Sequence, residues 1–364
     1  MKIAMVLPNK NSEKAISIYS QHLIDNIKKT GLNIKGVDYI AGSPISAFKI
    51  LPKLLKYDII HIQHEYNLFG GFGLPFFVLF FFLRIFKKGL LVITMHTILS
   101  QKEKFKSTKI KTFLRKILYR LQNRLINWAS DIIIVHENFS KEILTKEYGV
   151  SKENIRVLPQ GIIENITFTN KQKAKKELNL SGPVYLMIGN LTYDNGSDII
   201  LKQAGKIEKN ILFVTNPNAV NTRNKKEILD WINFNKTIVK KNNFQKFVRF
   251  DLKEIPDTLW WKYFSAADLI LLPYRGGIRS GIFSDAIAAK KPMIGSNINF
   301  FREYAKKYGF IRIAKKEEDF PKEINEAMKI SNYKKMRSAF ERYIKEYGFS
   351  SLARKYKKLY SSLK

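Results

Sequence analysis

Side chains that can carry chemistry accompany two neighbouring apolar runs in the first third of the chain. Polar groups and a glycine pair follow or interrupt the run 58–62: His61, Gln63, His64, Glu65, Tyr66, Gly70 and Gly71. The next run, 90–95, ends at His96. A single histidine is more often structural than catalytic, but three of the chain's five histidines arrive at these two run ends. We therefore expect a functional site here, with glycines that let the backbone approach a ligand.

A second group of such residues follows the apolar run 269–272. Arg275 and Arg279 precede Ser280 and Gly281, which open a predicted helix over 282–290. Backbone amides at a helix N-terminus, a small Ser-Gly pair and two guanidinium groups form a cradle for an anion such as a phosphate or diphosphate. Taken alone, the loop is explained equally well as a glycine-rich turn with solvated arginines.

Several kinds of chemistry are excluded by composition. The chain has no cysteine, which removes disulfides, cysteine–zinc sites, iron–sulfur clusters and thiol catalysis. It contains no Asp-x-Asp tripeptide, so a transferase that clamps its diphosphate through a metal held by such a pair is disfavoured. His61 and His64 are three apart on a strand end and would point to opposite faces. We expect no bound metal and no cofactor.

The elements that position these residues follow an alternating pattern. Apolar runs that predict strands are separated by helical stretches such as 17–29 and 109–128: 3–7, 58–62, 90–95, 131–135, 184–188, 211–215, 248–250, 269–272 and 292–295. Several runs are continuously apolar, which is typical of strands buried on both faces of a parallel sheet. The pattern predicts two doubly wound halves, whose ligands bind beyond the carboxyl ends of the strands.

Length and composition agree with two domains. The 364 residues are 45% hydrophobic and contain 26 Phe and 17 Tyr, so disorder does not describe the chain as a whole. The apolar stretch before Pro8 is too short for a signal-peptide core, and we expect it to be the first strand. A polar, turn-rich segment at 165–170 precedes a lysine-rich helix start at 171–176. We place the domain boundary there.

The charge of the chain suggests an anionic partner. A formal net charge of +33 predicts nucleic acid, an anionic membrane surface or simply a solvated basic surface. Residues 102–124 hold nine basic residues against one acid, Glu103. The apolar residues of helix 109–128 recur every three or four positions, which commits them to a core and disfavours nucleic-acid binding. We therefore expect an anionic membrane surface and no nucleic acid.

A phenylalanine-rich segment adds to the membrane interpretation. The segment 74–86 has 13 positions, is apolar except for Arg84, and falls well short of the roughly 20 residues that cross a bilayer. It is either a buried crossover helix or a helix whose exposed side enters the membrane interface. Exposed members are expected among Phe76, Phe77, Phe80 and Phe81.

Seven segments, in this order, give the chain a family resemblance: IIHIQHEYNLFGG, VITMHT, VLPQGI, GNLTYDNGSDIIL, ADLILLPY, SGIFSDAIAAKKPMIGS and FSSLARKYKKLYSSL. The chain resembles the retaining, nucleotide-sugar-dependent glycosyltransferases of family four. The resemblance implies the GT-B fold, which is two facing Rossmann-like doubly wound domains with a deep interdomain cleft. The N-terminal, acceptor-side domain would span 1–165 together with a C-terminal helix, 346–364, that crosses back to it. The nucleotide-sugar domain would span 166–345.

The resemblance also implies roles for individual residues. His96 matches the histidine placed against the donor sugar, and His64 and Glu65 match the catalytic loop that faces the acceptor. Ser280 and Gly281 match the residues whose amides meet the diphosphate, and Asp285 stands where the family commonly has a glutamate that binds the nucleotide ribose. The remaining positions of the two loops are implied to line the acceptor or donor side: His61, Gln63, Tyr66, Gly70 and Gly71 for the acceptor; Gly189, Asn190, Asn195, Arg275 and Arg279 for the donor.

The chain departs from the family at its phosphate grip. The family's arginine and lysine, in a G-R-(four residues)-K-G pattern, correspond to Asn190 and Asn195, so both charges are absent. The family's leading glutamate, eight residues before Asp285, is Gly277, and residues 9–14 replace its usual Gly-Gly turn. Two explanations remain open. Arg275 and Arg279 replace the lost charges, or the protein is a catalytically silent partner of another enzyme.

The function implied is transfer of a sugar, with retention and without a metal, from a nucleotide-sugar to a lipid-linked or cell-envelope glycan acceptor. The nucleotide-sugar is a co-substrate. We expect a cytoplasmic protein on the inner face of the cell membrane. The alternatives are a silent GT-B subunit that binds sugar or lipid, and a nucleotide-sugar epimerase or glycan phosphorylase of the same fold.

Overall fold

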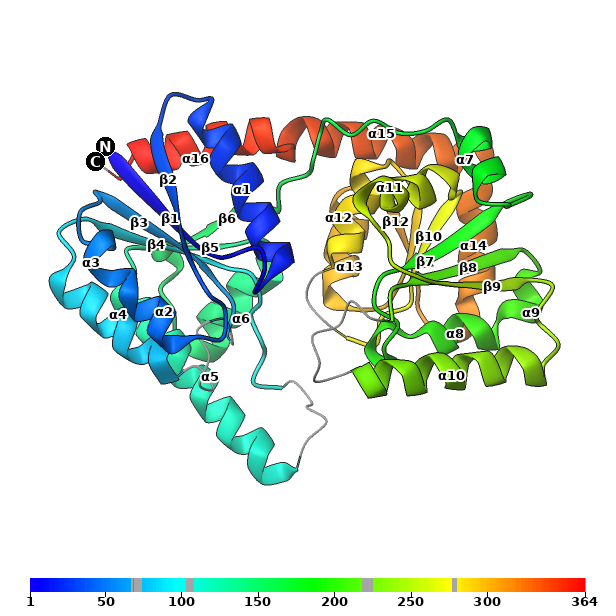
Figure 1. Ribbon diagram of the computed structural model, residues 1–364, viewed down its shortest axis with the longest axis horizontal. Helices are drawn as coiled ribbons and strands as arrows, with labels where there is room; N and C mark the ends of the chain where they lie inside the picture. Colours follow the sequence, from blue (N-terminus) through cyan, green and yellow to red (C-terminus); the bar gives the residue numbers. More distant parts are fainter. Residues whose placement is uncertain (67, 69–73, 103–107, 218–224, 277–279, 364) are drawn as a thin grey trace. The chain divides into compact units, whose positions relative to one another are not determined.

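The computed structural model describes residues 1–66, 68, 74–102, 108–217, 225–276 and 280–363 (Figure 1). The chain forms two compact units. The N-terminal unit comprises Met1–Gly161 and Glu346–Lys364, and the C-terminal unit comprises Ile162–Lys345. Each unit is built around its own six-stranded parallel sheet. This confirms the predicted α/β class with two doubly wound sheets.

The N-terminal sheet has the strand order β2-β1-β3-β4-β5-β6. Its strands are β1 (Lys2–Pro8), β2 (Asn33–Tyr39), β3 (Ile59–His64), β4 (Leu90–Met95), β5 (Ile132–Val135) and β6 (Ile155–Val157). Its helices are α1 (Lys14–Lys28), α2 (Pro44–Lys49), α3 (Leu51–Leu54), α4 (Leu74–Phe86), α5 (Lys109–Ala129), α6 (Asn138–Tyr148) and α16 (Phe349–Ser361), with a short turn of 3₁₀ helix, η2 (Lys152–Asn154).

The two faces of this sheet are covered by different helices. Ile60 and Ile62 of β3 belong to the apolar core that also contains Phe80 of α4 and Ile126 of α5. His61 lies between these two isoleucines in the strand and points to the opposite face, where it contacts Tyr360 of α16. The C-terminal helix therefore packs on the N-terminal unit beside α1, as the resemblance implied.

The C-terminal sheet has the strand order β12-β11-β10-β7-β8-β9. Its strands are β7 (Val184–Ile188), β8 (Asn210–Thr215), β9 (Val248–Leu252), β10 (Leu269–Leu272), β11 (Met293–Ser296) and β12 (Ile311–Ala314). Its longer helices are α7 (Lys171–Glu177), α10 (Lys225–Lys241), α11 (Asp257–Ala266), α12 (Gly281–Ala288), α13 (Asn299–Lys307), α14 (Phe320–Met328) and α15 (Ile330–Tyr347). Shorter ones are α8 (Ser197–Lys202), α9 (Ala204–Ile207), η3 (Tyr193–Asn195) and η4 (Glu317–Asp319).

The packing of α5 differs from the prediction. Its apolar residues were expected in the core, but Phe113, Leu114 and Leu121 are 63%, 59% and 48% exposed, respectively. Instead, the buried residues of α5 include Gln122 and Asn123. The helix follows a 3.6-residue period, but the period identifies an apolar face without saying whether that face meets the core. The reason for disfavouring nucleic-acid binding from this helix is therefore wrong.

The phenylalanine-rich helix α4 is half buried. Leu79, Phe80 and Leu83 lie in the core, whereas Phe81 is 50% exposed. Of the four phenylalanines among which exposed members were expected, Phe81 is exposed and Phe80 is buried. The side chain of Phe76 lies outside the described residues. Across the part of the chain that the structure describes, we find no helix with the length and apolarity needed to cross a bilayer.

Candidate functional site

The C-terminal sheet changes winding direction between β7 and β10, which are neighbours in the sheet but not in the sequence. In sequence terms its order is the 3-2-1-4-5-6 arrangement of nucleotide-binding folds, which bind their ligands beyond the strands at this reversal. The loops that leave the two strands there begin at Gly189 and Pro273. Arg275, Ser280 and Gly281, which the sequence predicted as part of an anion cradle, thus lie in or beside the loop where the topology places a ligand.

Glycine is required where these two loops approach each other. At Gly196, φ is +69°, and a Cβ atom would lie 1.9 Å from the carbonyl oxygen of Pro273. Gly189 has a φ of +109° with the side chain of Ile282 close by. Only glycine tolerates both the positive φ and the backbone contact at Gly196. These glycines let the 189–196 loop pack against the residues that follow β10.

Ser280 stands at the N-terminal end of α12 and is tied to the loop after β10. Its Oγ lies 2.8 Å from the hydroxyl of Tyr274 rather than capping the helix. The first amides of a helix have no acceptor within the helix, and Gly281, the first residue of α12, is exposed. The start of α12 therefore presents backbone donors and the positive end of the helix dipole, which is an arrangement suited to an anion.

Arg275 is held by an ion pair. Its Nη2 donates to Oδ2 of Asp198 at 2.7 Å, its Nη1 donates to the carbonyl of Tyr193 at 2.6 Å, and the guanidinium lies 4.0 Å from the Tyr193 ring centre. Burial alone would raise the pKa of Asp198, but the hydrogen bond and charge of Arg275, with Lys202, hold it below its ordinary value. The charge of Arg275 is thus partly balanced. Arg279 lies outside the described residues.

The Asp285 carboxyl in this unit has a strongly raised pKa. It lies in α12, one turn after Gly281, and the indole Nε1 of Trp260 donates to its Oδ2 at 3.1 Å. Burial raises the pKa of this carboxyl to about 7; the Trp260 hydrogen bond opposes the shift and the charge of Asp257 adds to it. A carboxyl that changes charge near neutral pH in a candidate nucleotide site is a functional candidate on physical grounds.

In the N-terminal unit, His96 follows β4 and contacts Gln63 of the neighbouring strand β3. The distance from His96 Nε2 to Gln63 Oε1 is 2.8 Å. The rings of Tyr19 and His136 pack against the His96 ring, each with 5.3 Å between ring centres. His96 is 6% exposed, so the network around it fixes the orientation of its ring.

The loop after β3 is also held from both sides. Glu65 is half buried and its Oε2 accepts from the Thr97 hydroxyl at 2.6 Å. His64 is fully buried with its ring edge against Tyr66, and burial lowers its pKa to about 3, so it is neutral at physiological pH. The hydroxyl of Tyr66 donates to Asn123 of α5 at 3.1 Å. Gly70 and Gly71 lie outside the described residues.

His61 is an interior residue and not part of a surface loop. It is fully buried, and burial lowers its pKa to about 3. Its Nδ1 lies 2.5 Å from the Tyr360 hydroxyl and its Nε2 lies 2.7 Å from Thr94 Oγ1. The structure therefore brings His61, Gln63 and His96 together beneath α16, while His64 and Tyr66 lie on the opposite face of the sheet.

Sequence reasoning missed several members of these clusters. His136 follows the apolar run 131–135 just as His96 follows its own run, so the same signal could have found it. Tyr360 lies in the C-terminal helix, for which the resemblance implied only that it crosses back to the N-terminal domain. Asp198 and Trp260 had no such signal, because each acquires its role only through a partner far away in the chain, Arg275 and Asp285 respectively.

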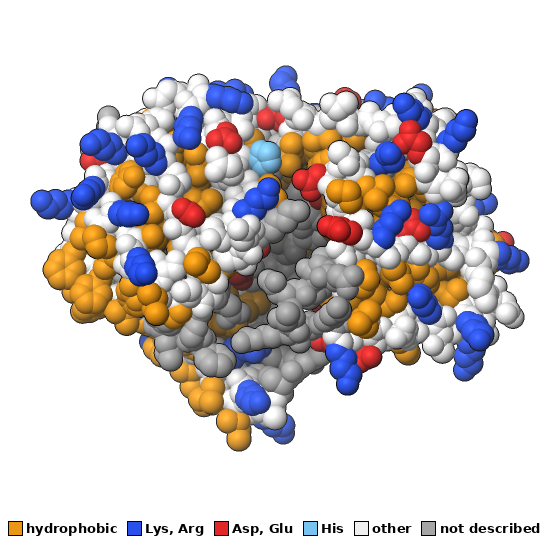
Figure 2. All heavy atoms as spheres, in the orientation of Figure 1, with side chains coloured by type: hydrophobic (Ala, Val, Ile, Leu, Met, Phe, Trp, Pro, Cys, Tyr) orange, Lys and Arg blue, Asp and Glu red, His pale blue; other side chains and the backbone are white. Residues whose placement is uncertain are grey.

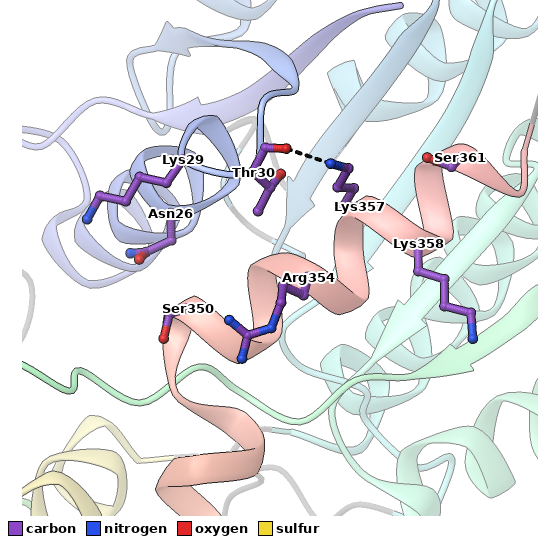
Figure 3. Close-up of a pocket in the computed structure, with 8 residues that line it drawn as sticks. All are labelled: Asn26, Lys29, Thr30, Ser350, Arg354, Lys357, Lys358 and Ser361. Carbon is purple, nitrogen blue, oxygen red and sulfur yellow. Dashed lines mark hydrogen bonds between the residues drawn. The ribbon is translucent and has the colours of Figure 1, made fainter.

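A cavity of about 620 Å³ lies elsewhere in the N-terminal unit, between α1 and α16 (Figure 3). Its lining combines four cations with small polar residues: Asn26, Lys29, Thr30, Ser350, Arg354, Lys357, Lys358 and Ser361. The ammonium of Lys357 donates to the Thr30 carbonyl just beyond α1 at 2.7 Å (Figure 3). A cation there interacts favourably with the negative end of the α1 dipole, so Lys357 serves the packing of the two helices. None of the predicted site residues that the structure describes lines this cavity.

Comparisons with known proteins agree with the geometry. The model of Glycosyltransferase Family 4 matches residues 22–165. No curated protein sequence matches the chain. The fold is similar to that of Anabaena Alr3699/HepE, solved in complex with UDP and glucose, with a TM-score of 0.72 and 13% identity over the whole of both chains.

Two further solved structures share the fold. Sucrose-phosphate synthase from Thermosynechococcus elongatus has a TM-score of 0.72 and 16% identity, covering 100% of this chain and 99% of that one. A glycosyltransferase from Rickettsia africae has a TM-score of 0.68 and 14% identity, covering 100% and 98%. These matches extend over both units, whereas the family model covers the N-terminal one. Residues 22–165 are thus similar to glycosyltransferase family 4, and the chain as a whole has the GT-B fold that its sequence motifs indicated.

Proposed function

We propose that this protein is a nucleotide-sugar-dependent glycosyltransferase that serves a lipid-linked or cell-envelope glycan acceptor at the cytoplasmic face of the membrane. The observation that carries the donor part is the start of α12 beside the β7–β10 reversal, with Ser280, Gly281 and Asp285 on one element. Helix amides suit a diphosphate and a carboxylate suits a ribose diol. The HepE structures contain UDP, glucose or UDP-glucose, which supports a UDP-sugar donor here.

In this mechanism the chain supplies binding and charge stabilisation. The amides at the start of α12 would stabilise the departing diphosphate, and Arg275 would add positive charge from the neighbouring loop. His96 would hydrogen-bond the sugar and orient it for transfer with retention. No step requires a metal held by the protein.

The Arg275–Asp198 ion pair favours a second candidate, which is a catalytically silent subunit that binds sugar or lipid. A guanidinium already paired with a carboxylate offers less charge to a diphosphate than the family's arginine and lysine pair would. The silent subunit would bind a sugar or lipid through the same loops without turnover.

The acceptor part rests on a surface of the N-terminal unit that we call the α4–α5 apolar surface. Its members are exposed by 39% to 73%: Val78, Phe81, Phe82, Ile85, Phe86, Ile110, Phe113, Leu114, Ile117, Leu121 and Trp128. The two helices are joined where the Phe81 ring stacks on Trp128, with 6.0 Å between centres. Figure 2 shows apolar side chains gathered at the left and the bottom of the view, the region where Figure 1 draws α4 and α5. Exposed apolar patches of this extent mark binding surfaces.

The charges around this surface support an anionic membrane as its occupant. Neither α4 nor α5 contains an acidic residue. Arginines of α5 are interspersed with its apolar face: Arg115, Arg120 and Arg124 are all exposed. A helix with an apolar face and basic flanks lies in the plane of the interface, and each basic residue near an anionic leaflet adds about 1 kcal/mol. In Figure 1 the N-terminal part of α5 reaches beyond the rest of its unit.

A thermal-shift screen tests the donor proposal. The purified protein is heated with uridine, guanosine, adenosine and cytidine diphosphates and with their sugars. A ligand at 100 times its dissociation constant should add about 2.7 kcal/mol of stability. Stabilisation by one nucleotide series, followed by sugar transfer to a polyprenyl or diacylglycerol acceptor, supports the enzyme. Stabilisation without transfer to any acceptor supports the silent subunit, and no stabilisation by any nucleotide rejects the donor site.

A further inference from the structure

A chain of buried polar groups links the C-terminal helix to His96. Tyr360 of α16 contacts His61 Nδ1, His61 Nε2 contacts Thr94, and the Gln63 amide nitrogen lies 3.4 Å from the same His61 Nε2. The other end of the Gln63 amide, Oε1, lies 2.8 Å from His96 Nε2. His61, Gln63 and Thr94 are completely buried, so these contacts are shielded from bulk solvent.

The structure directs the amide nitrogen of Gln63 to His61 and its Oε1 to His96, and with this orientation the donors and acceptors agree in one arrangement. His61 is neutral, so one ring nitrogen donates and the other accepts. If Nε2 donated to Thr94, its hydrogen would face the Gln63 amide hydrogens. If instead Nδ1 donates to the Tyr360 oxygen, Nε2 accepts from Thr94 and, weakly, from Gln63, and no two donors meet. Because Gln63 Oε1 can only accept, His96 Nε2 must be the donor in its contact with Gln63.

We propose that Gln63 is a positioning residue that holds His96 in the tautomer protonated at Nε2, with its orientation set by His61 and Tyr360. The lone pair of His96 then lies on Nδ1, where it accepts a hydrogen bond from a hydroxyl of the donor sugar. This second step rests on the proposed function; the tautomer does not. Tyr19 and His136, whose rings pack on His96, keep the imidazole plane fixed.

The tautomer is measured directly by two-bond ¹H–¹⁵N correlation spectra of protein labelled in its histidine rings. The chain has only five histidines, so five ring systems appear, and single substitutions assign them. We expect His96 to be protonated at Nε2 and His61 at Nδ1, which are opposite patterns in one spectrum. A His96 ring protonated at Nδ1 in the wild-type protein would overturn the proposal without any reference to activity.

Variants then test the role of Gln63. Gln63→Met keeps the length of the side chain and removes the acceptor, so His96 should become a mixture of tautomers. The kcat should fall about tenfold, which is 1.36 kcal/mol, with the KM for the donor nearly unchanged. Tyr360→Phe should release the tautomer of His61. The matched control is Gln122→Met, a buried glutamine of α5 on the opposite face of the sheet, which should leave the His96 spectrum and kcat unchanged.

Ligand additions separate this inference from the proposed function. A nucleotide-sugar should shift the Nδ1 signal of His96, and the nucleoside diphosphate alone should not. If no nucleotide binds at all, the donor proposal fails while the tautomer assignment stands. If the sugar binds and is transferred, yet Gln63→Met retains a single Nε2–H tautomer and full kcat, Gln63 is only a packing residue and the positioning role is rejected.

Discussion

At the scale of single residues, the sequence predicted the positions of several site residues but not their hydrogen-bond partners. The sequence placed His96, Ser280 and Asp285 at the ends of predicted strands or the start of a helix, and the structure finds them there. The partners that define their chemistry are Gln63, Tyr274 and Trp260. A hydrogen bond between distant segments depends on sub-ångström packing, which neither periodicity nor spacing encodes.

Asp285 gives the nucleotide affinity a pH dependence. Ribose hydroxyls donate to a carboxylate, so binding requires the ionised form, and with a pKa of about 7 the ionised fraction rises about tenfold between pH 6 and pH 8. We expect nucleoside diphosphate affinity, measured by calorimetry, to rise by a similar factor over this range. Asp285→Asn should flatten the profile. Because the terminal phosphate also titrates near pH 6, only the difference between the two proteins counts, and parallel profiles contradict this role.

The same carboxyl affects folding stability with a definite sign. Its folded pKa is raised above the unfolded value of about 3.9, so the native state binds the proton more tightly. The free energy of unfolding should therefore decrease as the pH rises from about 4 to about 7. Above about pH 7 the Asp285 carboxyl is ionised in both states and adds no further change. Urea denaturation at pH 5 and pH 8 should show a smaller decrease in Asp285→Asn than in the wild type. An equal decrease would place the perturbed group elsewhere.

Arg275 can be tested through its partner. If its guanidinium faces the diphosphate, Asp198→Asn should release positive charge and strengthen nucleoside diphosphate binding several-fold, while Arg275→Ala should weaken it more than tenfold. Arg275→Ala also leaves Lys202 as the ion-pair partner that we describe for the buried Asp198 carboxylate, and this loss should cost up to about 3 kcal/mol of stability. The double change Asn190→Ala with Asn195→Ala is the control and should have a small effect. Similar small losses in all three variants would favour the silent subunit.

At the scale of elements, the sequence predicted the interior strands and missed edge strands. The nine apolar runs correspond to strands of the two sheets, whereas β2, β6 and β12 escaped notice. All three lie at sheet edges. An edge strand is exposed on one side, and β2 accordingly contains Lys35 and Asp38 among its apolar residues. Continuous apolarity signals only strands that are buried on both faces.

The same physics explains the error at α5. Periodicity identifies an apolar face, and the core is the usual place for one, so the exposed stripe from Ile110 to Trp128 looked like a core face. What distinguishes the two cases is the opposite face. In α5 that face buries Tyr119, Gln122 and Asn123, with Asn123 accepting from Tyr66. A helix can bury a polar face when other buried groups hydrogen-bond to it. Such partners come from other segments of the chain and are seen only in the folded unit.

The α4–α5 apolar surface should supply the salt-resistant part of binding to anionic membranes. Phe81→Ser together with Phe82→Ser removes two half-exposed rings of α4 and should leave the fold intact while abolishing salt-resistant binding to anionic vesicles. Phe80→Ser in the buried core is the matched control and should instead lower the melting temperature strongly, because a buried phenylalanine contributes about 3–5 kcal/mol. A folded Phe81→Ser, Phe82→Ser protein that still sediments with vesicles in high salt would reject this surface.

At the scale of the whole molecule, a net charge of +33 and the α4–α5 apolar surface act together. The Debye length shrinks from about 10 Å at 0.1 M salt to about 3 Å at 1 M, so salt weakens the electrostatic part and spares the apolar part. We expect co-sedimentation with vesicles containing phosphatidylglycerol that is reduced but not abolished at 1 M salt, and little binding to phosphatidylcholine alone. A merely solvated basic surface would bind neither kind of vesicle in high salt. A nucleic-acid-binding protein would prefer duplex DNA over vesicles in direct competition.

Removal of three exposed arginines, Arg115→Ser, Arg120→Ser and Arg124→Ser, should lower binding at 0.1 M salt by about 1 kcal/mol per charge and leave the salt-resistant fraction unchanged. If these arginine substitutions lower binding equally at 0.1 M and 1 M salt, the electrostatic and apolar contributions are not separable. The proposal that salt-resistant binding comes from the apolar surface alone would then be wrong.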